Sequence, residues 1–326
     1  MTLTVQTDLA PMLAGLLAAV LCGVLGGLLV LRRSAMMGDA LSHAVLPGLV
    51  LGFILTGSRA SLPMLVGAGL AALASVGLIA LLRRAGRLEP GAAMGVVFSV
   101  MFALGIVLLR VAGDRVDLDP DCVLYGVLEA IRWPGVSSLA DLTQPAAWAA
   151  APRQVVTLAA VLALALAMLG VMYKQVRLWC FDPALAGAMG LRPGLVGLVV
   201  MALVAAATVA SFEAVGSILV VALLACPGIA ARQLTDRFGP HLLLSGLIAG
   251  VAAIGGYLGA VFLPALLGHD QAVSASGSIA VASGLLLLLA IAVRKLRTRL
   301  RTRAHAGGIG AQASAAGQAR MDAQGV

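Results

Sequence analysis

The sequence predicts an all-α, polytopic membrane protein with eight or nine transmembrane helices. Apolar runs of roughly 20 residues, the length needed to cross a bilayer core, recur from one end of the chain to the other. Of the 326 residues, 61% are hydrophobic and only 11% are charged. The 39 glycines fit this class, because small residues allow membrane helices to pack closely.

The apolar runs divide the chain into nine expected spans. They lie near residues 11–31, 41–57, 61–82, 91–110, 154–173, 194–211, 213–231, 241–263 and 277–293. Only Ser211, Phe212 and Glu213 separate the sixth from the seventh, so eight spans are the alternative. Proline at position 227 is expected to kink or end the seventh span.

The two ends of the chain differ from its middle. Residues 1–10 carry Asp8 but no lysine or arginine, unlike the basic start of a cleavable signal peptide, and are expected to form an outer N-terminal segment. Residues 11–293 form one transmembrane domain. Residues 294–326 form a basic cytoplasmic tail, rich in Ala, Gly, Gln and Ser from about residue 304 and expected to be disordered.

Basic residues set the expected orientation. With the N-terminus outside and the C-terminus in the cytoplasm, most of the 22 lysines and arginines lie in cytoplasmic segments. The net charge of +8 is therefore read as a topology signal, and nucleic acid is not an expected partner. Acidic residues collect on the outer side, where they would either concentrate cations or simply mark a translocated loop.

The strongest candidate site is a pair of polar residues at the start of the second apolar run. Asp39 and His43 are four residues apart, so on a helix they share one face. A carboxylate and an imidazole together suit a divalent transition metal, and ionisable groups in lipid usually face a pathway. The alternatives are that Asp39 caps the helix and that His43 bonds a neighbouring helix.

Two further features are less specific. Glu213 is expected to mark a hydrated outer turn, with a place along a metal pathway as the alternative. Residues 181–190 are expected to form a short amphipathic helix, with Asp182 as N-cap, Pro183 at the first helical position and Gly190 at the end. That helix is either an ordinary connector or a docking element for a soluble partner.

The chain shows no motif for chemistry of its own. It contains no Gly-x-x-x-x-Gly-Lys-Ser/Thr phosphate loop, so ATP hydrolysis by that route would need another subunit. Its four cysteines are scattered without the spacing of a metal knot and are expected to be packing thiols. We therefore do not expect an enzyme.

Three segments resemble the membrane permease subunits of bacterial ABC importers for zinc, manganese and iron. They are residues 31–48, with Gly-Asp-Ala-Leu-Ser-His-Ala-Val-Leu-Pro-Gly at 38–48; residues 95–105; and residues 181–227, with Ser-Phe-Glu-Ala-Val-Gly-Ser at 211–217. The resemblance covers most of residues 11–293.

The resemblance implies a permease in the bacterial inner membrane, with two copies or a close paralogue forming the pathway. A separate ATPase would lie beneath them, and an extracytoplasmic metal-binding protein would deliver the ion. It implies a transient metal contact at Asp39 and His43, with Glu213 as a third candidate, and no permanently bound cofactor. The short helix would couple to the ATPase through Asp182, Pro183, Leu185, Ala186, Met189 and Gly190.

Two rival functions remain open from the sequence. A permease of similar build for an iron chelate or cobalamin would carry a ligand that is already coordinated, and would need no Asp–His pair. An ion-coupled secondary carrier would need no ATPase and would more often show paired acids deep in several spans.

Overall fold

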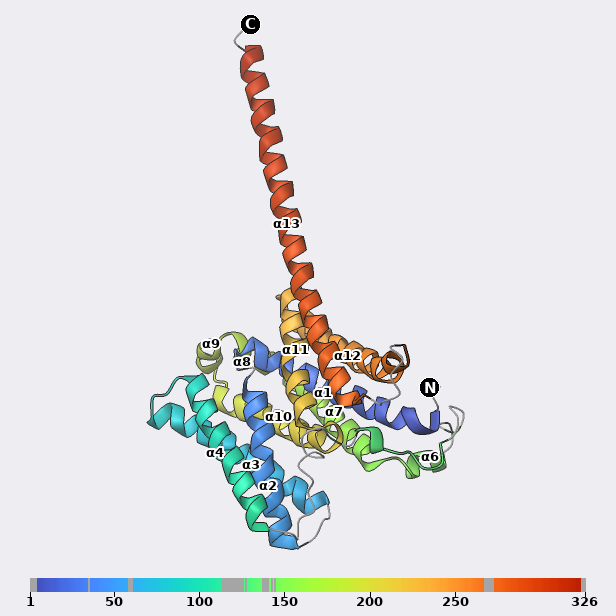
Figure 1. Cartoon of the computed structure of the whole chain (residues 1–326). Coiled ribbons are helices and arrows are strands. Elements are labelled where there is room, and N and C mark those ends of the chain that lie inside the picture. Colours follow the sequence, from blue (N-terminus) through green and yellow to red (C-terminus); the bar gives the residue numbers. More distant parts are fainter. Residues whose placement is uncertain are drawn as a thin grey trace.

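The computed structural model describes residues 5–34, 36–57, 61–112, 126, 128–136, 141, 143, 145–266 and 273–323, and these residues are helical with no strand among them (Figure 1). The elements are α1 (Val5–Leu31), α2 (Met36–Thr56), α3 (Ser61–Ala85), α4 (Pro90–Ala112), η2 (Leu128–Ala130), α6 (Pro145–Ala149), α7 (Arg153–Val171), α8 (Tyr173–Phe181), α9 (Pro183–Ala188), α10 (Pro193–Val215), α11 (Ser217–Leu234), α12 (Phe238–Leu266) and α13 (Ala275–Ala323). Within these residues, 8 helices are long and apolar enough to cross a membrane, and α2 adds a shorter apolar stretch at Leu46–Thr56. The predicted all-α membrane fold is confirmed.

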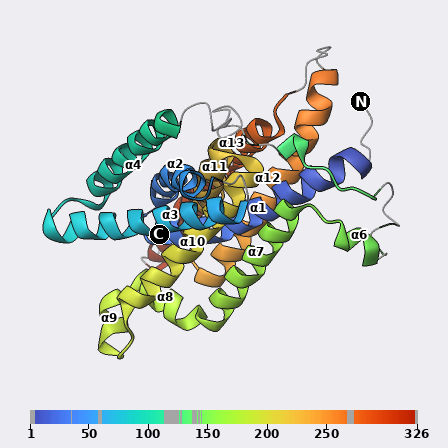
Figure 2. The same ribbon diagram turned by 90° about the horizontal axis from the view of Figure 1, so that it is seen from below.

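Helix α1 lies at the centre of the packing. It contacts α7, α10, α11 and α12, and Figure 2 shows it running between α7 and α12. The helix begins at Val5 rather than near residue 11, so the expected polar outer segment is mostly helical. One reason is that Asp8 has a partner, because the Tyr257 hydroxyl of α12 donates to Asp8 Oδ1 at 2.9 Å.

Small residues set how closely these helices approach. A Cβ added at Gly26 of α1 would overlap the backbone oxygen of Leu224 in α11. A Cβ at Gly23 would lie 3.0 Å from the backbone oxygen of Ser245 in α12. Backbone contacts this close require residues without side chains, as is usual in membrane bundles.

Helices α2, α3 and α4 form a second group beside the first. Gly48 of α2 and Gly67 of α3 face each other so closely that a Cβ on either would overlap the backbone of the other. On α4, a Cβ at Gly105 would lie 2.9 Å from the side chain of Leu46. Helices α10 and α11 join the two groups, because each contacts both α1 and α2.

A single residue, Gly216, separates α10 from α11. Its φ of 78° lies in the left-handed region, which glycine adopts without steric cost. The two helices run in clearly different directions from this point (Figure 1), so residues 193–234 form two helices rather than one long span. Helix α11 does not end at Pro227 but continues through it to Leu234, so of the two expected effects only a kink remains as a prediction.

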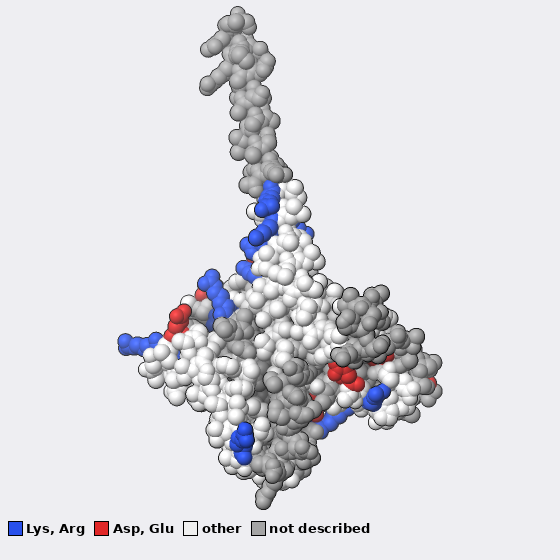
Figure 3. Space-filling model, viewed as in Figure 1, with Lys and Arg blue, Asp and Glu red and all other residues white. Residues whose placement is uncertain are grey.

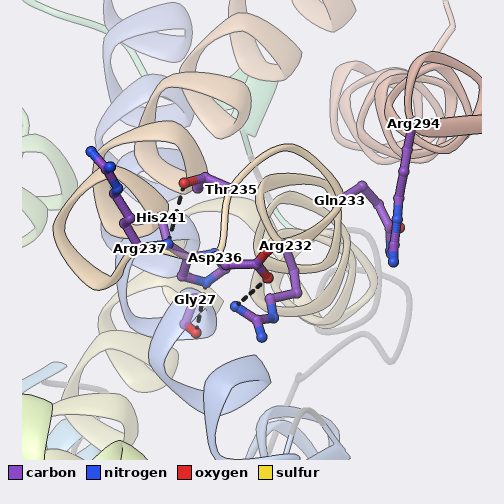
Figure 4. Close-up of polar contacts among 8 residues, drawn as sticks. All are labelled: Gly27, Arg232, Gln233, Thr235, Asp236, Arg237, His241 and Arg294. Carbon is purple, nitrogen blue, oxygen red and sulfur yellow. Dashed lines mark hydrogen bonds and ion pairs between the residues drawn. The ribbon is translucent and has the colours of Figure 1, made fainter. Parts of the chain in front are cut away.

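The short turn from α11 to α12 is held by polar contacts (Figure 4). Arg232 forms an ion pair with Asp236 at 3.1 Å, and the Arg237 amide donates to Thr235 Oγ1 at 3.3 Å. One turn into α12, His241 Nε2 lies 3.1 Å from the carbonyl oxygen of Gly27 in α1. His241 is fully buried.

The C-terminal region differs most from expectation. Helix α13 extends over 49 residues to Ala323 and projects from the bundle, where the composition predicts disorder from about residue 304 (Figure 1). Residues 304–323 contain many alanines and no proline. Alanine has the highest helix propensity, so this stretch can continue a helix that the membrane span has already started.

Candidate functional site

His43 lies on α2 and faces α4. Its ring packs edge-to-face on Phe98, with ring centroids 4.6 Å apart at 69°, and on Phe102, at 5.2 Å and 83°. The two phenylalanines stack on each other at 6.2 Å. His43 is half-buried, so the aromatic pair orients the ring while part of it stays accessible.

Asp39 lies one helical turn before His43 on the same helix. The backbone of α2 is helical from Met36 to Thr56, so the two positions share one face, as the spacing predicts. The Asp39 side chain lies outside what the structure describes. Joint binding of a metal by Asp39 and His43 therefore stays a prediction.

The start of α2 is fixed against its neighbours. A Cβ at Gly38, beside Asp39, would lie 2.7 Å from a methyl carbon of Leu224 on α11. Beyond His43, the side chain of Pro47 lies 3.1 Å from where a Cβ at Gly105 would be. The segment of α2 that carries Asp39 and His43 is thus packed between α11 and α4.

Glu213 lies within the last turn of α10, not in a loop between two spans. It is half-buried and follows Phe212, which packs with Val209, with Ala68 of α3 and with Leu49 of α2. Among the described residues, no group of three or more His, Cys, Asp or Glu side chains could hold a metal. The Asp39 side chain is not among those described, so a shared metal centre of Asp39, His43 and Glu213 stays a prediction.

Helix α9 has the ends that its sequence predicts. Asp182 caps the N-terminus, with Oδ1 accepting from the Leu185 amide at 2.9 Å, and Pro183 occupies the first turn. At the other end, the Leu191 amide donates to the Ala186 carbonyl at 3.0 Å, and Gly190 has a φ of 80°. This is a Schellman closure, so both ends of a six-residue helix are fixed.

The surface around α9 is apolar and outward-facing. Phe181 at the end of α8, Leu185 within α9 and Met189 at the C-cap of α9 are 54%, 47% and 64% exposed. Ala186 is 1% exposed, so it holds α9 to the body of the protein and presents no contact surface. A short capped helix with exposed apolar side chains on it and at its two ends is suited to docking another protein.

A contact between Arg32 and Trp179 lies beside α9, and no local sequence pattern predicts it. The guanidinium of Arg32, at the end of α1, lies 4.4 Å from the centroid of the Trp179 ring and donates from Nη1 to the Trp179 carbonyl at 3.0 Å. A gap of 147 positions separates the two residues, so spacing along the chain could not relate them. Next to Trp179, burial raises the pKa of the Cys180 thiol to about 12, in keeping with a packing role.

The arrangement of membrane helices around α1, with a capped helix between α8 and α10, is that of a polytopic membrane protein. The chain matches the ABC 3 transport family over residues 6–141 and 147–294, and it belongs to that family.

Individual relatives are similar over most of their length. The chain is 39% identical over 272 residues to the manganese transport system membrane protein MntD of Bacillus subtilis, spanning 83% of this chain and 86% of that protein. It is 36% identical over 274 residues to the zinc transport system membrane protein TroD of Treponema pallidum, spanning 84% of this chain and 70% of that protein.

A solved structure has the same fold. The structure of PsaBC from Streptococcus pneumoniae in complex with Fab aligns with a TM-score of 0.68 and 26% sequence identity. The alignment covers 86% of this chain and 90% of that one. The long helices described above therefore follow a fold already observed in a related protein.

Proposed function

We propose that this chain is the permease subunit of an ABC importer that moves zinc, manganese or iron across the bacterial inner membrane by alternating access. The observation that carries the proposal is the family match over nearly the whole membrane domain. The names of the two relatives, a manganese and a zinc transport protein, support a divalent transition metal as the substrate. ATP hydrolysis belongs to a separate subunit, and a second permease copy or a close paralogue, with an extracytoplasmic metal-binding protein, completes the system.

The proposed pathway contact is Asp39 with His43. Helical spacing supports it, as does the half-buried ring of His43, which the two phenylalanines orient. Two ligands from one chain bind a metal weakly, which suits transit because a conducting site must release its ion. Glu213 remains a proposed third contact, and the symmetry of two copies would double the ligand set.

The proposed orientation puts the N-terminus outside and the C-terminus in the cytoplasm. Arg32, Arg83, Arg84 and Arg87 line one pocket, so the ends of α1 and α3 share one side of the protein. Asp8 meets Tyr257 near the opposite end of α1. Basic residues concentrate on the cytoplasmic side of membrane proteins, which supports placing the arginine pocket there.

A transport assay tests the function. We expect the full chain, reconstituted in liposomes with its ATPase and binding protein, to take up a radiolabelled divalent metal only when ATP is present. Uptake without ATP would indicate a secondary carrier. Uptake of a metal chelate but of no free metal ion would indicate the chelate class.

The site has its own test within that assay. Asp39→Ala with His43→Ala should lower metal uptake by at least about tenfold, because removing two metal ligands costs more than about 1.4 kcal/mol, while ATPase binding stays unchanged. His305→Ala, in the projecting part of α13, is the control and should leave uptake unchanged. Normal uptake by the double variant would contradict the assignment of Asp39 and His43 as the metal contact, and would leave the assignment as a permease standing.

Docking on α9 is tested by copurification. Leu185→Ser with Met189→Ser should weaken retention of the ATPase subunit, because both side chains are exposed and apolar. Val273→Ser, a comparably exposed position just before α13, is the matched control. Equal ATPase retention by all three proteins would exclude α9 as the docking element.

A further inference from the structure

We propose that a basic pocket beside α9 binds the phosphate-bearing headgroup of an anionic phospholipid. The pocket lies where the ends of α1 and α3 meet α8 and the start of α10. Its volume is about 630 Å³, and its lining includes Arg32, Arg83, Arg84, Arg87, Trp179 and Pro183. On the face seen in Figure 3, basic side chains lie around the base of the projecting part of α13, and others lie on the α9 side of the bundle with acidic side chains beside them.

The described residues form no ion pair with three arginines of this pocket. Arg83, Arg84 and Arg87 are exposed, and none of them has an ion pair or hydrogen bond to a described residue. Guanidinium groups bind phosphate through paired N–H donors and are weakly hydrated for a cation, so clustered arginines favour phosphate over water.

The fourth arginine is held in place by aromatic and backbone contacts. Arg32 lies over the Trp179 ring and donates to the Trp179 carbonyl. Those contacts use Nη1 and one face of the guanidinium, so donors remain on its other edge. The pocket thus combines one arginine held by contacts with three exposed ones on the α3 side.

An apolar cavity of about 270 Å³ continues from the same residues into the bundle. It shares Arg32, Ala80, Arg83 and Trp179 with the basic pocket. Its remaining lining is mainly apolar and includes Val76, Ile79, Met94, Leu198 and Met201. The two cavities together are basic at one end and apolar at the other.

This amphipathic shape favours a lipid over the other anions that could reach the site. Free phosphate would use the arginines alone, and an acidic protein surface would have no use for the apolar cavity. An acyl chain fits it, because most of its lining is apolar. Basic pockets between transmembrane helices are known to take anionic headgroups.

The test is a calorimetric titration of the detergent-purified full chain with short-chain phosphatidylglycerol. We expect Arg83→Gln, Arg84→Gln and Arg87→Gln each to weaken binding by about fivefold. The triple variant should lose most of the binding. The matched control neutralises three basic residues of α13 (Lys295→Gln, Arg297→Gln and Arg299→Gln) and should bind as the unmodified protein does.

A second variant tests the shape of the site without changing its charge. Ala80 is exposed and lines both cavities, so Ala80→Trp should fill them while every arginine stays in place. We expect this variant to lose phosphatidylglycerol binding. Retained binding would mean that diffuse surface charge, not a pocket, holds the lipid, and would overturn the proposal.

Three further results of these titrations would assign the pocket to a ligand other than an anionic lipid. Arginine-dependent binding of inorganic phosphate as tight as that of phosphatidylglycerol would assign the site to free phosphate. Equally tight binding of phosphatidylcholine would remove the requirement for an anionic lipid. Unchanged lipid binding by the triple variant, with loss of the ATPase subunit, would assign the pocket to an acidic protein surface.

Discussion

Helices α1 and α3 are both long and apolar, yet they occupy opposite environments. In α1, 72% of the membrane span is buried inside the protein, whereas in α3 only 22% is. Helix α1 is enclosed by α7, α10, α11 and α12, while α3 leaves residues such as Leu70 and Leu81 exposed. An apolar membrane helix therefore corresponds here to a protein core in one case and to a largely exposed surface in the other.

This difference shows what stabilises each region. Lipid tails are as apolar as leucine, so exposed apolar side chains of α3 gain little from contact with protein. Helix α1 depends instead on close packing and on hydrogen bonds between helices, because these are lost when its neighbours separate. Mutations that test packing should accordingly affect α1 much more than α3.

The largest expected effect comes from adding one methyl group to α1. Gly26→Ala would place a Cβ against the backbone oxygen of Leu224, which cannot move without separating α1 from α11. We expect a loss of about 3 kcal/mol, measured as the free energy of unfolding in detergent. Gly69→Ala on α3 meets no atom within 4 Å and should not destabilise the protein. Equal stability of the two variants would refute the close approach of α1 and α11.

The second effect comes from removing buried volume. Leu25 of α1 is 0% exposed and Leu70 of α3 is 63% exposed. Leu25→Ala leaves a cavity in the bundle and should cost about 2 kcal/mol, while Leu70→Ala should change stability by less than about 0.5 kcal/mol. Thermal unfolding midpoints of the two variants provide the measurement. A large loss for Leu70→Ala would mean that this face of α3 is covered by protein, as a second permease copy would do.

The smallest expected effect is the difference in stability loss when each of two buried serines is replaced by alanine. Ser245 of α12 donates to the Gly23 carbonyl of α1, while Ser75 of α3 donates to the Ala71 carbonyl of its own helix. Ser245→Ala removes a bond between helices and should cost about 1 kcal/mol. Ser75→Ala removes a bond within one helix and should cost less than about 0.5 kcal/mol. The same unfolding assay measures both, and a reversed order would contradict the contrast between α1 and α3.

Local signals predicted parts of this molecule well. Long apolar runs predicted the membrane helices, and the caps of α9 followed from Asp182, Pro183 and Gly190. Such features depend on residues close in the chain, so the sequence states them directly. The helical spacing of Asp39 and His43 was predictable for the same reason.

Contacts between distant segments were not predictable. Nothing near His241 in the sequence indicates that Gly27 of α1 would accept a bond from its ring, and nothing near His43 indicates Phe98 or Phe102. Helix α13 was misjudged for a different reason. Composition alone indicated disorder, whereas propensity allows a helix that has already started to continue.

The junction at Gly216 links three elements into one mechanical unit. Gly126, with a φ of 75°, lies so close to Val215 and Gly216 that a Cβ on it would overlap their backbone. Nearby in the chain, Glu129 of η2 accepts from the Ala275 amide at 2.6 Å at the start of α13. A rotation of α10 relative to α11 would therefore either move the η2 segment and the start of α13 as well or break these contacts.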